Sequence, residues 1–246
     1  MPDRSSADRA TRALSFGPAA DVYERARPGY PAAAVRDLLG PAPRDVIDVG
    51  AGTGKLTRAV AGEGHRVVAV DPSAGMLAAL RVAVPGVETR VGTAESLPAA
   101  DRSVDAVVAG QAYHWFDPPV ALPEIGRVLR PGGTLGLLWN SRDETVPWVA
   151  RFGELILSHE DGSTALTEPP MAPPFGRATV RWYDHEQRMT VDGLVDLAHS
   201  RSTLLVLAED ERAACLQRVR ALGESVAANG VITLPYRLQV WSATRD

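Results

Sequence analysis

The 246-residue sequence has a single cysteine, Cys215, so no disulfide can form within the chain. Cys215 lies in an apolar stretch of a predicted helix, and no basic cluster or helix N-terminus is near it to lower its pKa. We therefore expect this side chain to be buried packing rather than a nucleophile. The scarcity of cysteine is typical of a reducing compartment and predicts a cytoplasmic protein.

Long hydrophobic runs and long runs of like charge are also absent. The apolar runs at residues 67–70 and 104–109 have the length of strands, far below the ~20 residues that span a bilayer. Residues 1–12 lack the apolar core of a signal peptide. A formal net charge of −4 gives no basic patch for a phosphate backbone. The sequence therefore predicts neither a membrane nor a nucleic acid as a partner.

Histidine is sparse and shows none of the paired spacing that metal ligands require. The five histidines are widely separated along the chain, at His65, His114, His159, His185 and His199. We therefore expect no metal site.

Regular alternation of short β-branched runs with helical patterns begins at residue 44 and predicts β–α–β units in a parallel sheet. Apolar residues make up 45% of the chain and charged residues 23%, as in an ordinary globular protein. Strands are predicted at residues 45–49, 66–71, 88–92, 104–110, 134–140, 178–189 and 231–243. Helices are predicted at residues 55–63, 73–82, 119–129, 146–160, 191–200 and 209–228. The expected fold is α/β, a doubly wound, mostly parallel seven-stranded sheet that ends in a C-terminal antiparallel hairpin.

A glycine-rich turn, DVGAGTG at residues 48–54, follows the first predicted strand and leads into a helix. Glycines let a ligand approach the backbone closely, and a helix N-terminus offers free N–H groups. The spacing is G-x-G-x-G, whereas the dinucleotide fingerprint is G-x-G-x-x-G, so a nicotinamide-dependent dehydrogenase is disfavoured. Asp71 ends the second strand, where its carboxylate can accept both hydroxyls of a ribose; alternatively, it caps the helix that begins near residue 73.

Four sequence features occur in the order and spacing of a known family. They are VIDVGAGTG at residues 46–54, Asp71, TAESLP at residues 93–98 and RVLRPGG at residues 127–133. Together they resemble the class I S-adenosylmethionine (SAM) dependent methyltransferases, over most of the chain. QAYHWF at residues 111–116 and YERARPGYP at residues 23–31 look like the branch of trans-aconitate-type and other small-molecule methyltransferases. The resemblance implies one Rossmann-like domain over residues 1–246, with residues 1–40 as a cover segment and residues 141–175 as a substrate-side insertion.

The resemblance also implies which residues meet the cofactor, SAM. The first two glycines of the turn would line its methionine and ribose portion, Asp71 would hold the ribose, and Ala94 would meet adenine through its backbone. Many relatives carry an acid where this chain has Thr93, so either Thr93 or Glu95 would bind the adenine amine; Glu95 could instead stabilise a helix N-terminus. The residues expected at the cofactor are Tyr23, Arg27, Asp48, Gly50, Ala51, Gly52, Asp71, Pro72, Met76, Thr93, Ala94, Glu95, Gln111, Ala112 and Trp115.

Residues just after the fourth and fifth strands should face the reacting sulfonium, because ligands of such sheets lie beyond the carboxyl ends of the strands. His114 is the candidate base, with an ordinary pKa near ~6.5. It could instead bind the cofactor, or orient a carboxylate acceptor that needs no base. The expected catalytic residues are His114, Tyr113 and Asn140. Aromatic rings and arginines that suit a planar or anionic acceptor give the expected substrate residues Tyr30, Trp139, Arg142, Tyr183 and Arg201.

The sequence thus predicts an enzyme that transfers the SAM methyl group to an oxygen, nitrogen or carbon nucleophile of a small molecule, as in natural-product biosynthesis. Oxygen is our first choice, and we expect a monomer or a homodimer. One alternative keeps SAM but lets its own amine attack, so that a ring closes and methylthioadenosine is released. Another is a SAM-binding module without catalysis. The nucleoside product distinguishes the first two, since methyl transfer yields S-adenosylhomocysteine (SAH).

Overall fold

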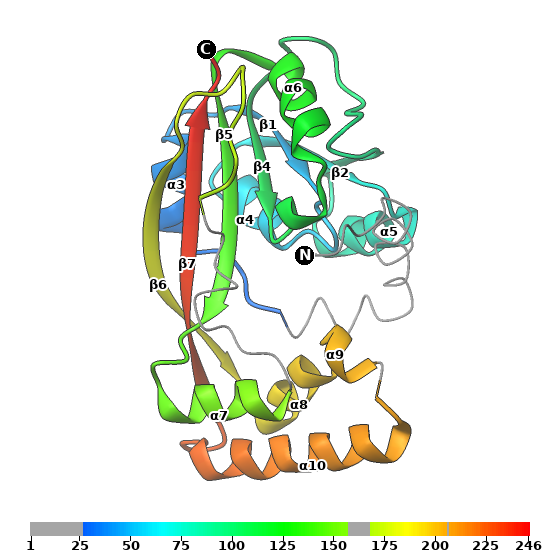
Figure 1. Cartoon of the computed structure of the whole chain (residues 1–246), viewed down its shortest axis with the longest axis vertical. Helices are drawn as coiled ribbons and strands as arrows, with labels where there is room; N and C mark the ends of the chain where they lie inside the picture. Colours follow the sequence, from blue (N-terminus) through cyan, green and yellow to red (C-terminus); the bar gives the residue numbers. More distant parts are fainter. Residues whose placement is uncertain (1–26, 157–167, 206) are drawn as a thin grey trace.

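The fold is built on one seven-stranded sheet (Figure 1), and the computed structural model describes residues 27–156, 168–205 and 207–246. The strand order is β3-β2-β1-β4-β5-β7-β6. The strands are β1 (Asp45–Val49), β2 (Arg66–Asp71), β3 (Glu88–Val91), β4 (Val104–Gly110), β5 (Leu129–Arg142), β6 (Thr179–Met189) and β7 (Ile232–Thr244). Pairs among β1 to β5 are parallel, whereas β7 runs antiparallel to both β5 and β6. The predicted fold class is confirmed.

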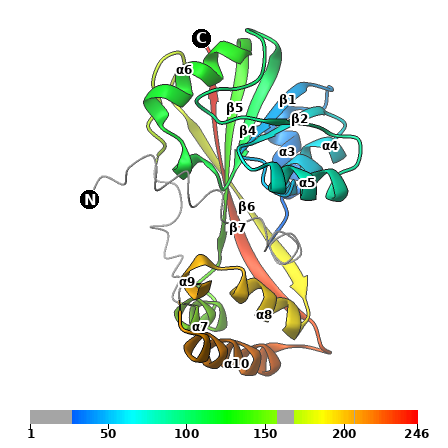
Figure 2. The same ribbon diagram turned by 90° about the vertical axis from the view of Figure 1, so that its right-hand side faces the viewer.

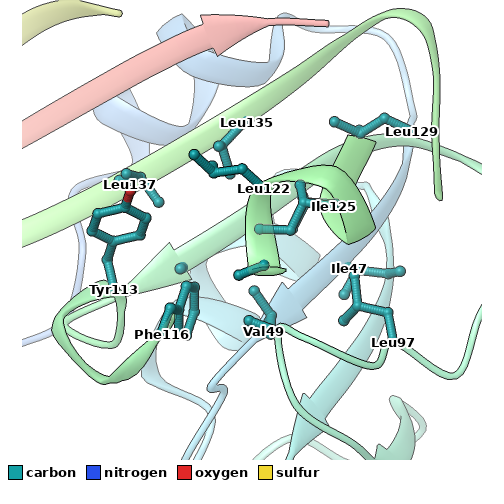
Figure 3. Packing of buried hydrophobic residues seen from close by; sticks show 14 of the residues in the cluster. Ile47, Val49, Leu97, Tyr113, Phe116, Leu122, Ile125, Leu129, Leu135 and Leu137 are labelled. Atoms are coloured by element: carbon teal, nitrogen blue, oxygen red, sulfur yellow. The ribbon is translucent and has the colours of Figure 1, made fainter. Parts of the chain in front are cut away.

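Helices cover both faces of the sheet where its strands are parallel. These helices are α3 (Ala32–Leu39), α4 (Lys55–Gly62), α5 (Ala74–Ala83) and α6 (Pro118–Val128). Apolar residues of α3 and α4 form one buried cluster with β1, β4 and β5, and α6 forms another on the opposite face. Figure 3 shows Leu122 and Ile125 of α6 packed near Leu135 and Leu137 of β5. Burial on both faces explains the near-continuous apolar character of these strands.

A second group of helices packs at the ends of β5, β6 and β7 that lie away from α3 to α6 (Figures 1 and 2). These are α7 (Pro147–Leu155), α8 (Val191–His199), α9 (Ser202–Leu205) and α10 (Glu209–Val226). They share an apolar cluster that includes Phe152 of α7, Leu197 of α8, Val219 of α10 and Leu234 of β7. The extended ends of β5, β6 and β7 therefore connect this helical group to the body of the sheet.

Most predicted elements lie within two residues of their observed bounds, and the exceptions have local causes. Strand β5 starts at Leu129 rather than residue 134, because Leu129 and Thr134 both pair with β4 across an irregularity that contains Pro131 and Gly132. Helix α3, helix α9 and the short 3₁₀ helix η2 (Tyr113–Trp115) were not predicted. The predicted helix at residues 146–160 is observed as α7, and its last residues lie outside the described part of the chain.

Candidate functional site

A cavity lies beyond the carboxyl ends of β1, β4 and β5, where the sequence predicts the ligand. Its wall comes from the glycine-rich turn, the segment before α3, the ends of β4 and β5, the turn after α8, and β7. The lining residues are Arg27, Pro28, Tyr30, Asp48, Gly50, Ala51, Gly52, Thr53, Lys55, Leu56, Gly110, Gln111, Asn140, Arg201 and Tyr236. The predicted cofactor residues of the glycine-rich turn thus meet the predicted substrate residues Tyr30 and Arg201 in one place.

The glycine-rich turn passes close to the start of η2, and this contact requires glycine. A Cβ atom on Gly50 would lie 2.6 Å from the Cβ of Ala112, and the φ of Gly50 is +69°. The backbone N–H groups of Gly50 and Ala51 donate to the carbonyl of Val70, at 2.8 and 3.1 Å, which ties the turn to β2. Gly54, with a φ of +93°, is the N-cap residue of α4. The turn therefore holds the N-terminus of α4 beside the cavity.

Asp48 lies at the base of the cavity and is fully buried. Its Oδ2 accepts from the hydroxyl of Thr57 at 2.6 Å, and its Oδ1 has no hydrogen-bond partner among the described residues. Burial, the main cause, together with the nearby charge of Asp71, raises the pKa of Asp48 to about 7. A buried acceptor without a partner is costly, so Oδ1 is suited to receive a donor from a bound molecule.

Asp71 is held at the end of β2 by two backbone N–H groups. Its Oδ2 accepts from Gly52 at 2.9 Å and its Oδ1 accepts from Ser73 at 2.8 Å. Burial raises the pKa of this carboxyl group, and the two N–H donors oppose the rise. The N-cap of α5 is Ser73, whose hydroxyl accepts from the N–H of Met76. The N-cap of α5 is therefore Ser73, and Asp71 contacts this helix N-terminus through the N–H of Ser73 while its other oxygen binds the glycine-rich turn.

Gln111 adopts an unusual backbone conformation at the end of β4. Its φ is +54°, in the left-handed region that side chains other than glycine rarely enter. Its Nε2 donates to the main-chain carbonyl of Asn140 at 2.7 Å, and its Oε1 is buried with no partner among the described residues. Strain of this kind concentrates at functional sites. Gln111 and Asp48 thus present two buried oxygen acceptors among the cavity residues.

The segment that was expected to bind adenine forms a tight turn, with backbone hydrogen bonds between Thr93 and Ser96 in both directions. Glu95 accepts from the N–H of Asp117, the N-cap residue of α6, at 2.8 Å. This contact matches the alternative in which Glu95 stabilises a helix N-terminus. Other expected cofactor residues are not among the lining residues of the cavity: Asp71, Pro72, Met76, Thr93, Ala94, Glu95, Ala112 and Trp115.

The segment before α3 lines the cavity and contacts both the sheet and the helical group. Tyr30 lies against Gly110 so closely that a Cβ atom there would be 2.4 Å from the tyrosine oxygen. Arg27 Nη2 donates to the carbonyl of Ser200 at 3.3 Å, next to Arg201. Tyr23 lies outside the described residues. The described part of this segment therefore contributes Arg27, Pro28 and Tyr30 to the cavity wall, and its role as a cover stays a prediction.

Asn140 is a central residue of the cavity wall, and its amide group joins two distant segments. Its Nδ2 donates to the carbonyl of Gly29 at 3.1 Å, and its Oδ1 lies 2.7 Å from His185 Nε2. The ring of His185 stacks on Tyr236, which also lines the cavity, with centroids 5.5 Å apart. His185 and Tyr236 are not among the site residues that the sequence predicts. Neither has a local sequence signal, because the pairing of β6 with β7 is what brings them here.

His114 and Trp115 of η2 form an aromatic group with Trp139 of β5. The His114 ring centroid lies 4.5 Å from that of Trp115 and 5.0 Å from that of Trp139. Desolvation beside these rings lowers the pKa of His114 to about 4, although water reaches the exposed side of the imidazole and offsets part of this effect. The imidazole is therefore neutral near pH ~7. Trp115 stays 37% exposed, so the group is open to solvent.

Three predicted site residues have other contacts in the structure. The Tyr113 hydroxyl donates to the carbonyl of Pro170 at 3.1 Å, and its ring packs in the core (Figure 3). The Tyr183 hydroxyl donates to Asp37 of α3 at 2.9 Å. Arg142 is buried over the ring of Phe152 and pairs with Glu144 at 3.0 Å. None of the three lines the cavity, so the structure does not bring them to the predicted site.

The described ranges 27–156, 168–205 and 207–246 show two further features of the chain. They contain no group of three or more His, Cys, Asp or Glu side chains that could hold a metal ion. They also contain no helix that is both long and apolar enough to cross a membrane.

Known proteins are similar to this chain in sequence and in fold. A family model described as a methyltransferase domain matches residues 47–137. The chain is 45% identical over 234 residues to an uncharacterized methyltransferase of Mycobacterium tuberculosis (strain ATCC 25618 / H37Rv), covering 93% of this chain and 94% of that protein. It is 42% identical over 103 residues to a malonyl-[acyl-carrier protein] O-methyltransferase of Methylococcus capsulatus, covering 39% and 38%. A solved type II methyltransferase structure from Anaeromyxobacter dehalogenans, 26% identical, has a TM-score of 0.66 and covers 89% of this chain and 97% of that one.

Proposed function

Because the chain belongs to the class I SAM-dependent methyltransferases, we propose that it methylates an oxygen atom of a small-molecule acceptor. The observation that carries this proposal is the cavity at the carboxyl ends of β1, β4 and β5, with two unpartnered buried acceptors and an open aromatic group nearby.

The polar and charged residues that line the cavity fit the methionine end of SAM. Asp48 Oδ1 and Gln111 Oε1 are buried acceptors with no partner among the described residues, as an ammonium group requires. Arg27 and Lys55 bring positive charge to the same wall, which suits the carboxylate of the amino acid. Asp71, beside Gly52, is placed to accept the ribose hydroxyls. When bound, SAM supplies an activated methyl group.

The residues of the chain would then position the two partners and exclude water. Tyr30 against Gly110 and Arg27 at Ser200 hold the segment before α3 at the cavity wall, where it would cover the bound cofactor. Such closure holds reactants in a near-attack geometry, which can account for several kcal/mol of the barrier reduction. The nucleophile forms its bond to the methyl carbon as the sulfur–carbon bond breaks. A proton is lost only when the nucleophile carries one, as a hydroxyl does.

The surroundings of His114 favour a carboxylate oxygen as the nucleophile. An imidazole with a pKa lowered to about 4 is a weak base at neutral pH, so it is poorly suited to removing a hydroxyl proton. A carboxylate needs no base, and a neutral imidazole can donate a hydrogen bond that orients it. Arg201 adds positive charge to the cavity. The relative from Methylococcus capsulatus is named as an O-methyltransferase, which supports oxygen as the attacked atom.

A small acceptor is supported by the charge of the chain and by the aromatic group at His114. The formal net charge of −4 disfavours a nucleic acid substrate. Trp115 and Trp139 both lie close to His114 and suit an acceptor with a planar or apolar body. Membership of the trans-aconitate-type branch stays a prediction, as does the arrangement of residues 1–246 as one domain.

The test is to incubate the purified protein with SAM alone and then with pooled small carboxylic acids, phenols and amines. Mass spectrometry identifies the nucleoside product. We expect SAH to form only when carboxylic acids are present, and the methylated acid identifies the acceptor. SAH formed only with phenols or amines would contradict the carboxylate assignment. Methylthioadenosine above the no-enzyme rate, without any acceptor, would instead establish cyclisation of SAM.

A further inference from the structure

We propose that His185, on the edge strand β6, is a positioning residue that orients the Asn140 amide and thereby holds the segment at residues 27–31 over the cavity. The proposal rests on the proposed function only in that SAM or SAH is the ligand used to test it. His185 does not itself line the cavity, and no sequence motif points to it. Its role follows from the hydrogen bonds of Asn140 and from the stacking of His185 on Tyr236.

The orientation of the Asn140 amide is fixed by its partners. The carbonyl of Gly29 can only accept a hydrogen bond, so the atom that faces it at 3.1 Å must be the amide nitrogen of Asn140. The amide oxygen must then face His185, whose Nε2 lies 2.7 Å away. An oxygen cannot donate, and Nε2 of His185 therefore carries the hydrogen. The geometry assigns both the amide orientation and the histidine tautomer.

A second contact fixes the imidazole ring in place. His185 and Tyr236 are directly paired across β6 and β7, and their rings stack with centroids 5.5 Å apart and planes 22° apart. Tyr236 is buried and lines the cavity. A stacked ring has little freedom to rotate, so the Nε2–H of His185 stays directed at Asn140. Strand β6 thus acts on the cavity through Asn140 and Tyr236, which both line it.

A third contact makes Asn140 a junction between separate parts of the wall. Its main-chain carbonyl accepts from Gln111 Nε2 at 2.7 Å, while its side chain binds Gly29. Asn140 is only 4% exposed, so water cannot readily replace a lost partner. Without the His185 donor, the amide oxygen is left buried and unsatisfied, and the amide can turn away from Gly29. The segment at residues 27–31 would then lose a link to the sheet.

Because residues 27–31 include cavity residues, this loosening should weaken cofactor binding without unfolding the sheet. The matched pair of variants is His185→Phe, which keeps an aromatic ring for stacking on Tyr236, and His185→Gln, whose amide N–H can donate to Asn140. A role in packing alone would predict that the phenylalanine variant is the better substitute. A role in donating to Asn140 predicts the opposite order.

The experiment measures SAH affinity of the full chain by isothermal titration calorimetry, with the thermal midpoint of each variant as a check on folding. We expect His185→Phe to bind SAH about ten-fold more weakly than wild type, and His185→Gln to stay within about three-fold. Hydrogen exchange at the Gly29 and Tyr30 amides should rise in His185→Phe only. Wild-type affinity in His185→Phe, or equal losses in both variants, would overturn the proposal.

A measurement on the wild-type protein tests the proposal even if a variant does not fold. Long-range ¹H–¹⁵N correlation spectra report which ring nitrogen of a histidine carries the hydrogen. We expect the Nε2–H tautomer for His185, and the Nδ1–H tautomer would overturn the assignment. If wild-type protein binds no SAH, the cofactor part of the proposed function fails, whereas the tautomer result still decides the contact with Asn140.

Discussion

The hydroxyl of Thr57 donates to Oδ2 of Asp48 at 2.6 Å, and the other carboxylate oxygen, Oδ1, has no hydrogen-bond partner among the described residues. One oxygen of this buried carboxyl group is therefore satisfied by the fold, and the other is available to a ligand. With its pKa raised to about 7, Asp48 is protonated in much of the free protein near neutral pH. Binding of a cation beside Oδ1 would change that state.

Proton release on SAH binding follows from the position of Asp48. The ammonium group of SAH favours the ionised carboxylate and lowers the pKa of Asp48, so a fraction of a proton is released near pH ~6.5. Calorimetric titrations in buffers of different ionisation enthalpy measure this number. Asp48→Asn should abolish the release and weaken SAH binding roughly ten-fold. An unchanged proton count in the variant would assign the release to another group.

Asp48 should also make the free protein less stable at higher pH. The folded-state pKa of about 7 lies above the ordinary value of 3.8, so the folded state holds the proton more tightly than the unfolded state. The protonated form therefore contributes stability that is lost as pH rises between these two values. The free energy of unfolding of Asp48→Asn, relative to that of wild type, should therefore rise between pH ~5 and ~8. The rise is roughly 1.4 kcal/mol for each pH unit over which Asp48 is protonated in the folded state and ionised in the unfolded state. Urea unfolding of both proteins at pH ~5 and ~8 measures this change. A difference in the free energy of unfolding that does not depend on pH would contradict the raised pKa.

Close packing of the glycine-rich turn gives a third prediction. Gly50→Ala places a Cβ atom 2.6 Å from the Cβ of Ala112, at a φ of +69°. We expect a loss of about 1–3 kcal/mol in the free energy of unfolding, together with weaker SAH binding. Gly62→Ala is the matched control, because Gly62 ends α4 and no heavy atom lies within 4 Å of the added Cβ. Equal effects of the two substitutions would show that the contact with Ala112 does not matter.

The fold could be predicted from local patterns because its central strands are buried on both faces. Runs such as residues 104–110 are apolar throughout, and each is followed by turn residues, so their bounds agree with β1, β2 and β4. The glycine-rich turn is equally local, since its residues act through their own backbone. Helix α3 was missed because its N-cap is Pro31, which makes no side-chain capping bond, and no acid lies in its first turn.

The direction of side chains at the strand ends could not be read from the sequence. Asn140 and Arg142 lie on the same face of β5, yet the first lines the cavity and the second is buried over Phe152 in the helical group. Strand β5 extends to Arg142, and that length decides which of these residues lines the cavity. His185 depends on long-range pairing of β6 with β7. Such placements follow from register, for which one sequence carries no local signal.

Tyr113 should act as an anchor for the segment that follows residue 168. Its hydroxyl donates to the carbonyl of Pro170, so Tyr113→Phe leaves that carbonyl unpaired and costs about 1 kcal/mol of stability. Hydrogen exchange of the Met171 and Ala172 amides should become faster, with SAH affinity unchanged. Tyr183→Phe is the control, because it removes a hydroxyl that bonds to Asp37 on the other side of the sheet. A loss of turnover without a change in exchange would restore a catalytic role for Tyr113.

The pH profile of turnover separates the two roles open to His114. Its pKa is lowered to about 4, so the imidazole is already neutral above pH ~5.5, and the rate with a carboxylate acceptor should be flat from there to pH ~8. His114→Gln keeps a hydrogen-bond donor and should retain most of kcat, whereas His114→Phe should lower kcat about ten-fold with SAH affinity unchanged. A rate that rises with pH through ~6.5, and that becomes flat in His114→Gln, would instead identify a titrating base. That outcome would move the assignment from a carboxylate to a hydroxyl acceptor, because only the hydroxyl carries a proton that must be removed.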